Sequence, residues 1–196
     1  MPTTMYGATG SVGTYLVSYS GLSDGTNEYF EVIKVENPLT TPTFALQFVN
    51  LGNIENTSAA YNDAPQLGTA TAIETNDRRM YDAVWRDGSL YGATTIVGSG
   101  ADAGQVTVYW AEIDVSNFAA PVVAQQGTIG GEGIATGAVT FFPSIAVNTN
   151  GDVGIGFSAS AATIYGGAYF TWHDTADAAG TTRAPVTVQA GQDYYV

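Results

Sequence analysis

Short apolar or alternating segments, separated by turn residues, run through the whole chain, and they constrain its fold more than any other feature of the sequence. No window of about eleven or more residues repeats apolar positions at helical spacing without an interruption by Gly, Pro or β-branched residues. Asp87-Gly88 and Asn150-Gly151 are dipeptides typical of tight hairpin turns. The pattern predicts an antiparallel, all-β fold with few and short helices.

The predicted strands are short and are spread along the whole chain. Where both faces of a segment are apolar, as in residues 95–97, the strand is expected at the centre of stacked sheets. The segments predicted as strands are Tyr15–Ser20, Tyr29–Val35, Thr43–Val49, Met80–Trp85, Leu90–Val97, Val106–Val115, Val122–Thr128, Ser144–Val147, Val153–Ser158, Ala168–Trp172 and Val186–Gln189.

Val106–Val115 shows the clearest alternation. Tyr109 and Ile113 lie on one side of the expected strand, and Trp110 and Asp114 lie on the other. A period of two is expected when one face of a strand is buried. We therefore expect the side with Tyr109 and Ile113 to face the core.

The chain also contains weak internal repeats. Residues 81–94 and 144–157 share the order of short strand, Gly turn and small-residue strand, and each is followed by an alternating strand and an Ala-Pro step. A less regular copy precedes them. The units are roughly 1–52, 77–130 and 141–191, separated after the first unit by a long loop over 53–76, within a single domain covering 1–196.

Four strands in a meander, repeated about three times, is the pattern of a β-propeller, whose blades are four-stranded sheets. We therefore predict a β-propeller-like fold with about three antiparallel blades, as a partial ring or one completed by an oligomer. The alternative is a β-sandwich. Residues 192–196 resemble the start of another unit. Met5–Thr9 is similar in sequence to Leu90–Thr94, so the second strand of the first unit could instead lie earlier, at Met5–Thr9.

Residues 77–91 and 142–158 resemble blades of large secreted bacterial β-propeller proteins that are related in architecture to the sialidase-like group. The segment Asn148-Thr-Asn-Gly-Asp152 is a degenerate match to the Asp-box hairpin of that group. The arginine triad of sialidases has no visible counterpart, because Arg78 and Arg79 are adjacent and are expected to point to opposite faces of a strand. The resemblance implies the fold and export from the cell rather than a reaction.

The balance of charges limits the partners. The chain has 18 acidic and 5 basic residues, which gives a formal net charge of −13. A surface that neutralises phosphates cannot be assembled from so few cations, so nucleic acid is excluded as a partner and anionic membranes are disfavoured. An acidic surface is typical of extracellular or saline settings. We expect an extracellular or secreted protein whose export signal lies upstream of Met1.

The best candidates for catalysis are Asp77, Asp82 and Arg79. Glycoside hydrolases need two carboxylates that face one sugar, and these residues stand at the start of a predicted inner strand, where a propeller has its channel mouth. The alternative is a solvated turn with surface ion pairs.

Asn148, Asn150 and Asp152 carry oxygen ligands at alternate positions, as calcium loops do, so Ca²⁺ is the one cofactor that the sequence suggests. The alternative is an Asn-Gly hairpin turn whose side chains bond their own backbone. His173 is the only histidine, and we expect it half-exposed at the end of a strand.

Aromatic side chains are the richest signal for binding. Tyrosine and tryptophan rings that are exposed can bind flat sugar faces or protein partners. The alternative is that these rings are buried in the core between blades. We expect the loop over 53–76 at the rim of any binding site, because loops of this length are often functional. The candidate binding residues are Arg78, Tyr81, Trp85, Tyr91, Trp110 and Trp172.

These patterns favour a binding or assembly module of a secreted propeller protein, which contacts glycan or protein and forms a homo-oligomer if the ring is to close. The alternative is a carbohydrate-active enzyme, a glycoside hydrolase or a polysaccharide lyase, that uses the carboxylates at the channel mouth.

Overall fold

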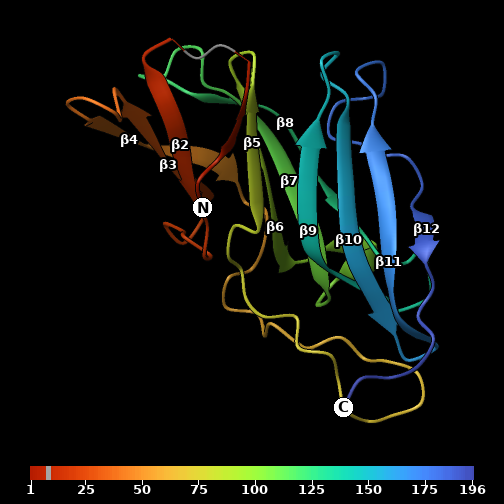
Figure 1. Ribbon diagram of the computed structural model, residues 1–196. Helices are drawn as coiled ribbons and strands as arrows, with labels where there is room; N and C mark the ends of the chain where they lie inside the picture. The colour runs from red at the N-terminus through yellow and green to blue at the C-terminus, as the bar shows by residue number, and fades with distance from the viewer. Residues whose placement is uncertain (8–9) are drawn as a thin grey trace.

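The computed structural model describes residues 1–7 and 10–196, which form three β-sheets (Figure 1). The sheets pack face to face, with the central sheet between the other two. The N-terminal sheet contains β2 (Val12–Ser18), β3 (Glu28–Glu36) and β4 (Thr43–Gly52). The central sheet has the order β1 (Thr4–Tyr6), β5 (Asp82–Arg86), β6 (Ser89–Val97), β7 (Val106–Asp114) and β8 (Val122–Ile129). The C-terminal sheet contains β9 (Val139–Val147), β10 (Val153–Ala161), β11 (Ile164–His173) and β12 (Val186–Gln189).

The all-β fold predicted from the sequence is confirmed. Every predicted strand overlaps a strand of the structure, and the short 3-10 helix η1 (Gly100–Asp102) is the one helical element in the described part of the chain. Consecutive strands pair antiparallel within each sheet, as they do in propeller blades. Across residues 1–7 and 10–196, no helix has the length and apolar character needed to cross a bilayer.

The sequence analysis does not predict β1, which also departs from the expected antiparallel pairing. Three residues are too few to show a period of two, and β1 pairs with β5 in the parallel direction. Met5 and Tyr6 therefore belong to the central sheet. The rest of the second register considered above falls partly on Ala8 and Thr9, which lie outside the described residues.

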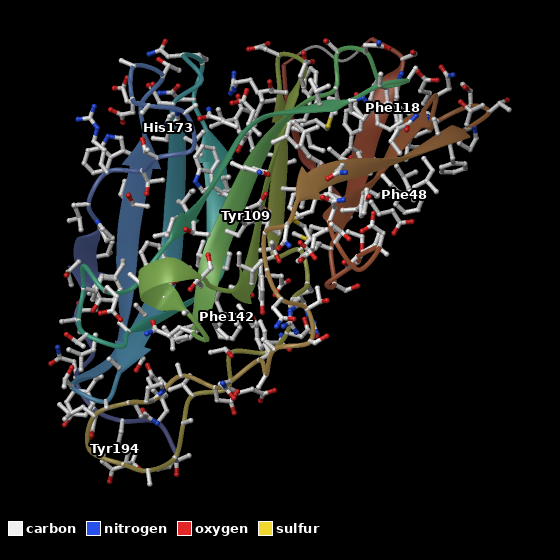
Figure 2. All side chains as sticks on the ribbon, turned by 180° about the vertical axis from the view of Figure 1, so that it is seen from behind. Phe48, Tyr109, Phe118, Phe142, His173 and Tyr194 are labelled. Atoms are coloured by element: carbon white, nitrogen blue, oxygen red, sulfur yellow. The ribbon has the colours of Figure 1, made fainter. Side chains whose placement is uncertain are left out.

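Two apolar cores separate the three sheets. The first fills the space between the N-terminal and central sheets and contains Phe30, Val32 and Tyr109. The second fills the space between the central and C-terminal sheets and contains Trp110 and Ile155. Figure 2 shows Tyr109 in the middle of the molecule, between the outlying sheets.

The expectation that β7 buries one face is wrong. Tyr109 and Ile113 pack in the first core as expected, but Trp110 on the opposite face is fully buried in the second core. The physical reason is that the central sheet is covered on both faces by other sheets. On the face of β7 that carries Trp110, only Glu112 and Asp114 at the end of the strand are half-exposed.

Residues 1–6 belong to two sheets. Residues 1–3 lie along β2: the Thr3 amide donates to the Tyr15 carbonyl at 2.9 Å, and the Val17 amide donates to the Met1 carbonyl at 2.8 Å. The next three residues form β1 in the central sheet. The segment thus holds the N-terminal and central sheets together at one edge.

A buried carboxylate fixes the start of the loop over 53–76. Glu55 accepts hydrogen bonds from the Tyr19 hydroxyl at 2.5 Å, from Arg78 Nε at 2.7 Å and from the Val97 amide at 3.0 Å. Tyr19 directly follows β2, Arg78 lies in the segment before β5, and Val97 is the last residue of β6. Glu55 therefore ties the loop to both of the first two sheets.

Candidate binding site

The outer face of the C-terminal sheet, which is turned away from the central sheet, has a floor of small residues. Alternate residues of β10 point into the second core, so Gly154, Gly156 and Ser158 point outward. A Cβ atom at Gly156 would have only the Tyr169 carbonyl oxygen nearby, at 4.0 Å. The space above this part of the sheet is therefore open.

Aromatic rings border the floor. Phe170 and Trp172 of β11 stack with their ring centroids 6.1 Å apart and their planes 18° apart. The Phe170 ring also leans over Gly154, where a Cβ atom would lie 3.1 Å from it. Phe142 of β9 borders the floor on the other side. We call this surface the trough, and it consists of Phe142, Gly154, Gly156, Ser158, Phe170 and Trp172.

Phe142 is held in an unfavourable backbone conformation. Its φ angle is +51°, in the left-handed region that bulky side chains rarely adopt and that costs about 1–3 kcal/mol. It lies where the β9–β10 pairing shifts register between Gly156 and Ser158. The residue is 41% exposed, and its ring meets the Tyr81 ring edge-on, with centroids 5.7 Å apart. Strained residues cluster at ligand sites, so Phe142 marks this border as a functional candidate.

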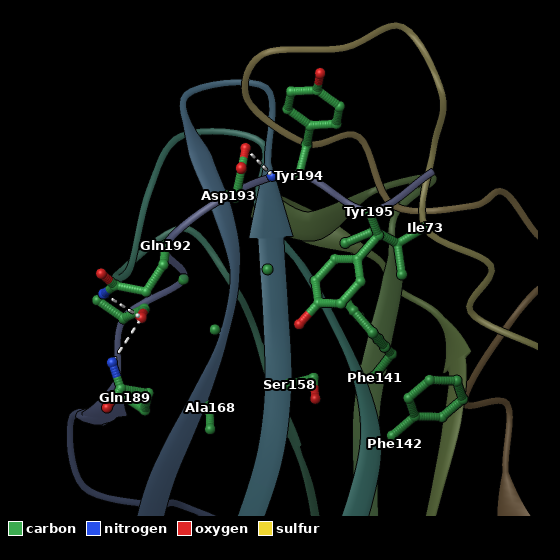
Figure 3. A pocket seen from close by; sticks show the side chains of 14 residues that line it. Ile73, Phe141, Phe142, Ser158, Ala168, Gln189, Gln192, Asp193, Tyr194 and Tyr195 are labelled. Carbon is green, nitrogen blue, oxygen red and sulfur yellow. Dashed lines mark hydrogen bonds between the residues drawn. The ribbon is translucent and has the colours of Figure 1, made fainter.

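Two hollows follow one another along the trough. The first has a volume of about 620 Å³, and Figure 3 shows Phe141 and Phe142 on one side of it, Gln189 and Gln192 on the other, and Ser158 between them. The second has a volume of about 630 Å³ and lies over Gly154 and Gly156. The charged residues that line the two hollows are all acidic: Asp152, Asp174 and Asp193.

The loop over 53–76 and the C-terminal segment close the end of the first hollow. Gln66 Nε2 donates to the Tyr195 carbonyl at 2.7 Å, and the Tyr195 amide donates to Gln66 Oε1 at 2.8 Å. Ile73 of the same loop lines the hollow beside Tyr195 (Figure 3). The loop thus forms part of the rim of this hollow, and its place at the rim of a binding site stays a prediction.

The candidate catalytic residues are engaged with separate partners. Both carboxylate oxygens of Asp77 accept from Arg79, at 2.7 and 2.6 Å, and this pairing holds the pKa of Asp77 below its usual range. Asp82 Oδ2 accepts from the Ser144 hydroxyl and the Ile145 amide, both at 2.9 Å. Asp82 therefore joins the central sheet to β9, while Asp77 and Arg79 form an exposed ion pair.

Among the candidate binding residues, Trp172 lies in the trough. Trp85 and Trp110 are buried in the first and second cores. Tyr91 is buried as well, and its hydroxyl donates to Glu112 at 3.1 Å. Burial, followed by the nearby Glu112 charge, raises the pKa of Tyr91 to about 12.

Arg78 and Tyr81 hold the polypeptide in place beside the central sheet. Arg78 pairs with Glu55 and lies over the Tyr61 ring, with 5.1 Å between the guanidinium carbon and the ring centroid. The Tyr81 hydroxyl donates to the Asp77 carbonyl at 3.0 Å. Tyr81 still reaches the trough indirectly, since its ring packs against Phe142.

The candidate calcium ligands form a hydrogen-bonded turn. Asn148 Oδ1 accepts from the Asn150 and Asp152 amides at 2.8 and 3.0 Å, and Asn148 Nδ2 donates to Asp152 Oδ2 at 2.7 Å. The second Asp152 oxygen accepts from the Thr175 amide at 3.2 Å. This is the arrangement of the alternative considered above, in which the side chains bond the backbone of a hairpin turn.

Asp152 predicts a dependence of stability on pH. The hydrogen bonds from Asn148 and Thr175 lower the pKa of Asp152 in the folded chain, so its ionised form stabilises the fold above the unfolded pKa of about 3.9. This contribution is lost as the pH falls through the folded pKa. We expect Asp152→Ala to lower the urea midpoint at pH 7, with a difference from the wild type that shrinks below about pH 4. A constant difference between pH 7 and pH 3 would contradict this role.

The expectation that His173 is half-exposed is wrong. The side chain is 2% exposed, its Nδ1 lies 2.7 Å from the Thr181 carbonyl oxygen, and its ring centroid is 5.4 Å from that of Trp110. The segment after β11 folds back over the end of the strand and covers it. His173 therefore closes one end of the second core.

Sequence reasoning did not identify most of the trough. Phe142, Gly154, Gly156, Ser158 and Phe170 are absent from the candidate residues, although Val153–Ser158 has a usable signal. Large apolar residues alternate there with Gly, Gly and Ser, which predicts one packed face and one bare face. The sequence alone does not show that the bare face lies at the outside of the stack.

Comparisons of the chain with protein-family models, curated proteins and solved structures found no match.

Proposed function

We propose that this chain is a non-catalytic assembly module that binds an apolar protein surface in the trough. The observation that carries the proposal is an open floor of Gly154, Gly156 and Ser158 bordered by the exposed rings of Phe142 and Phe170. Exposed apolar patches of this kind mark interaction sites in soluble proteins.

The charges around the trough favour an uncharged partner surface. The lining carries three aspartates, and the one cation that the described residues place beside it, Arg183, lies 5.8 Å from the Trp172 ring centroid and is paired with Asp177. A polyanionic ligand would meet repulsion there, and the chain as a whole has a formal net charge of −13. Interface cores are likewise depleted in charged residues and enriched in aromatic ones.

The arrangement of the carboxylates supports a non-catalytic role. A glycoside hydrolase needs one carboxyl group that donates a proton and a second one facing the same sugar. Asp77 is held ionised by Arg79, and Asp82 binds the backbone and side chain of β9. The enzyme considered from the sequence would have to release both groups from these partners.

Binding of the neutral apolar dye Nile red tests the trough as a binding surface. At micromolar protein concentrations we expect the dye to fluoresce with the wild type and to lose at least two-thirds of that signal with Gly156→Glu, whose carboxylate would stand in the open floor. Gly133→Glu is the matched control, because Gly133 is exposed and a Cβ atom there would meet nothing within 4 Å. Equal dye signals from the two variants would contradict the proposal.

A neutral glycan is the second candidate ligand. The parallel stack of Phe170 and Trp172 offers a flat aromatic surface of the kind that binds sugar faces. Displacement of Nile red by millimolar cellohexaose would favour the glycan over a protein partner. Unchanged dye fluorescence is the result expected for a protein-binding trough.

An extracellular location stays a prediction. The likeness to secreted proteins and the acidic composition support it.

A further inference from the structure

The outer face of the N-terminal sheet is the second large apolar surface of the molecule, at the opposite end of the stack from the trough. Phe44, Leu46 and Phe48 of β4 are 68%, 48% and 55% exposed. They alternate with residues that point toward the first core, such as Val49. Figure 2 shows Phe48 at the outer edge of this sheet, far from Phe142 at the border of the trough.

Neighbouring strands extend this apolar face. Leu46 pairs in register with Ile33 of β3, which pairs in turn with Leu16 of β2. Phe44 pairs with Val35, and Phe48 pairs with Glu31, the one charged residue among the outward-facing positions of β2, β3 and β4. We call the surface formed by Leu16, Ile33, Phe44, Leu46 and Phe48 the apolar ridge.

We infer that the apolar ridge of one copy of this chain binds in the trough of a second copy, an inference that rests on the proposed function of the trough. The two surfaces are complementary in shape. The ridge presents projecting phenylalanine and leucine side chains, and the trough presents glycines below two hollows of about 620 and 630 Å³. Large side chains opposite small ones are what interdigitating sheet faces require.

The same kind of contact already occurs twice within the chain. The N-terminal sheet packs its face with Phe30 and Val32 against the central sheet, and the central sheet packs its opposite face against the C-terminal sheet. A ridge seated in a trough would repeat this face-to-face contact between copies. The two free faces are the two ends of the stack, so one type of contact covers both.

The size of the faces allows a specific but weak contact. A strand spacing of about 4.8 Å and a rise of about 3.3 Å per residue give each sheet a flat area of roughly 400–600 Å². Burying one face of each copy therefore approaches the roughly 1,000 Å² that specific interfaces need. We expect a dissociation constant in the micromolar range for one such contact.

Two copies would bring six sheets together, within the four to eight blades that usually close a propeller ring. A closed dimer then contains two identical contacts, each between the ridge of one copy and the trough of the other. Both copies are strongly acidic, so salt that screens their repulsion should strengthen the dimer.

Sedimentation equilibrium between 1 and 200 μM tests the inference. We expect the wild type to approach twice its mass of 20.4 kDa as its concentration rises. Leu46→Asp on the ridge and Gly156→Glu in the trough should each stay monomeric and should weaken association at least tenfold. Val122→Asp is the matched control for an added charge, since Val122 is 56% exposed on β8, outside both surfaces. Circular dichroism checks that each variant is folded.

Mixing the two variants distinguishes the proposed contact from its symmetric alternatives. In the mixture, the intact ridge of Gly156→Glu meets the intact trough of Leu46→Asp, so a one-to-one dimer with a single contact should form. If Gly156→Glu alone dimerises, two ridges meet instead. If Leu46→Asp alone dimerises, two troughs meet. Either of these results, or a monomeric wild type at 200 μM, would overturn the inference.

Failure of this inference can be told apart from failure of the proposed function. A monomeric wild type that still binds Nile red in a Gly156-dependent way leaves the trough as a binding surface with a different partner. A wild type that binds no dye at low concentration removes the proposed function itself. Where both proposals hold, dye bound per chain should fall as the protein concentration rises, since the ridge displaces the dye.

Discussion

Replacing Glu55 by alanine is expected to lower the free energy of unfolding by about 3–5 kcal/mol. The Glu55 side chain is fully buried, and its removal leaves Arg78 without its ion-pair partner at a site where only 16% of the arginine side chain is exposed. The Tyr19 hydroxyl and the Val97 amide lose an acceptor at the same time. Urea unfolding followed by circular dichroism would measure the effect.

The matched control is Glu36→Ala, which breaks the half-exposed ion pair between Glu36 and Lys34. We expect that variant to change the free energy of unfolding by less than about 1 kcal/mol, because surface ion pairs contribute little. Glu55→Gln should fall between the two, since an amide oxygen still accepts hydrogen bonds but carries no charge. If Glu55→Ala costs no more than Glu36→Ala, the buried carboxylate does not hold the first two sheets and the loop together.

Trp110→Ala is expected to lower the free energy of unfolding by a similar amount, about 3–5 kcal/mol. Trp110 is fully buried between the central and C-terminal sheets and contacts the His173 ring. Truncation would leave a cavity in the middle of the second core, and the sheets on either side can close it only in part. Denaturant unfolding is again the measurement.

Trp110→Phe separates the loss of packing from the loss of a polar group. The indole nitrogen of Trp110 has no hydrogen-bond partner among the described residues, so phenylalanine removes ring volume and no hydrogen bond. We expect a loss smaller than that of alanine. Nile red binding in the trough should persist in the folded Trp110→Phe variant. A tryptophan that acts as a ligand platform would show the opposite pattern, with lost binding and unchanged stability.

The sheet layers could be predicted from the sequence because they depend on local signals. Gly turns such as Asp87-Gly88 and alternation within short segments set the strand boundaries, and the repeated order of strands indicates blades. Which face of a strand is buried could not be predicted in the same way. Alternation shows which residues lie on the same side of a strand, but it does not show what covers that side. Trp110 is an example. Glu112 and Asp114 on the same side of β7 suggest a solvent-exposed face, but the C-terminal sheet covers Trp110 and makes it a core residue.

The contacts that organise the candidate site are non-local and have no periodic signal. Glu55 and Arg78 are separated by an irregular loop. Gln66 and Tyr195 in the rim of the trough are 129 residues apart, with strands β5 to β12 between them. Residues that satisfy buried polar groups in this way are indistinguishable in sequence from exposed polar residues. The same holds for Asp82, whose partners Ser144 and Ile145 lie on another sheet.

The N-terminal segment has a consequence for the order of folding. Residues 1–3 need β2 as a neighbour, whereas Thr4 of β1 pairs with Val84 of β5, much later in the sequence. Pairings between distant parts of a chain carry a larger entropic cost of loop closure and form late. Residues 1–6 can therefore be fully docked only after β5 has joined the central sheet, and their docking couples the N-terminal and central sheets into one cooperative unit.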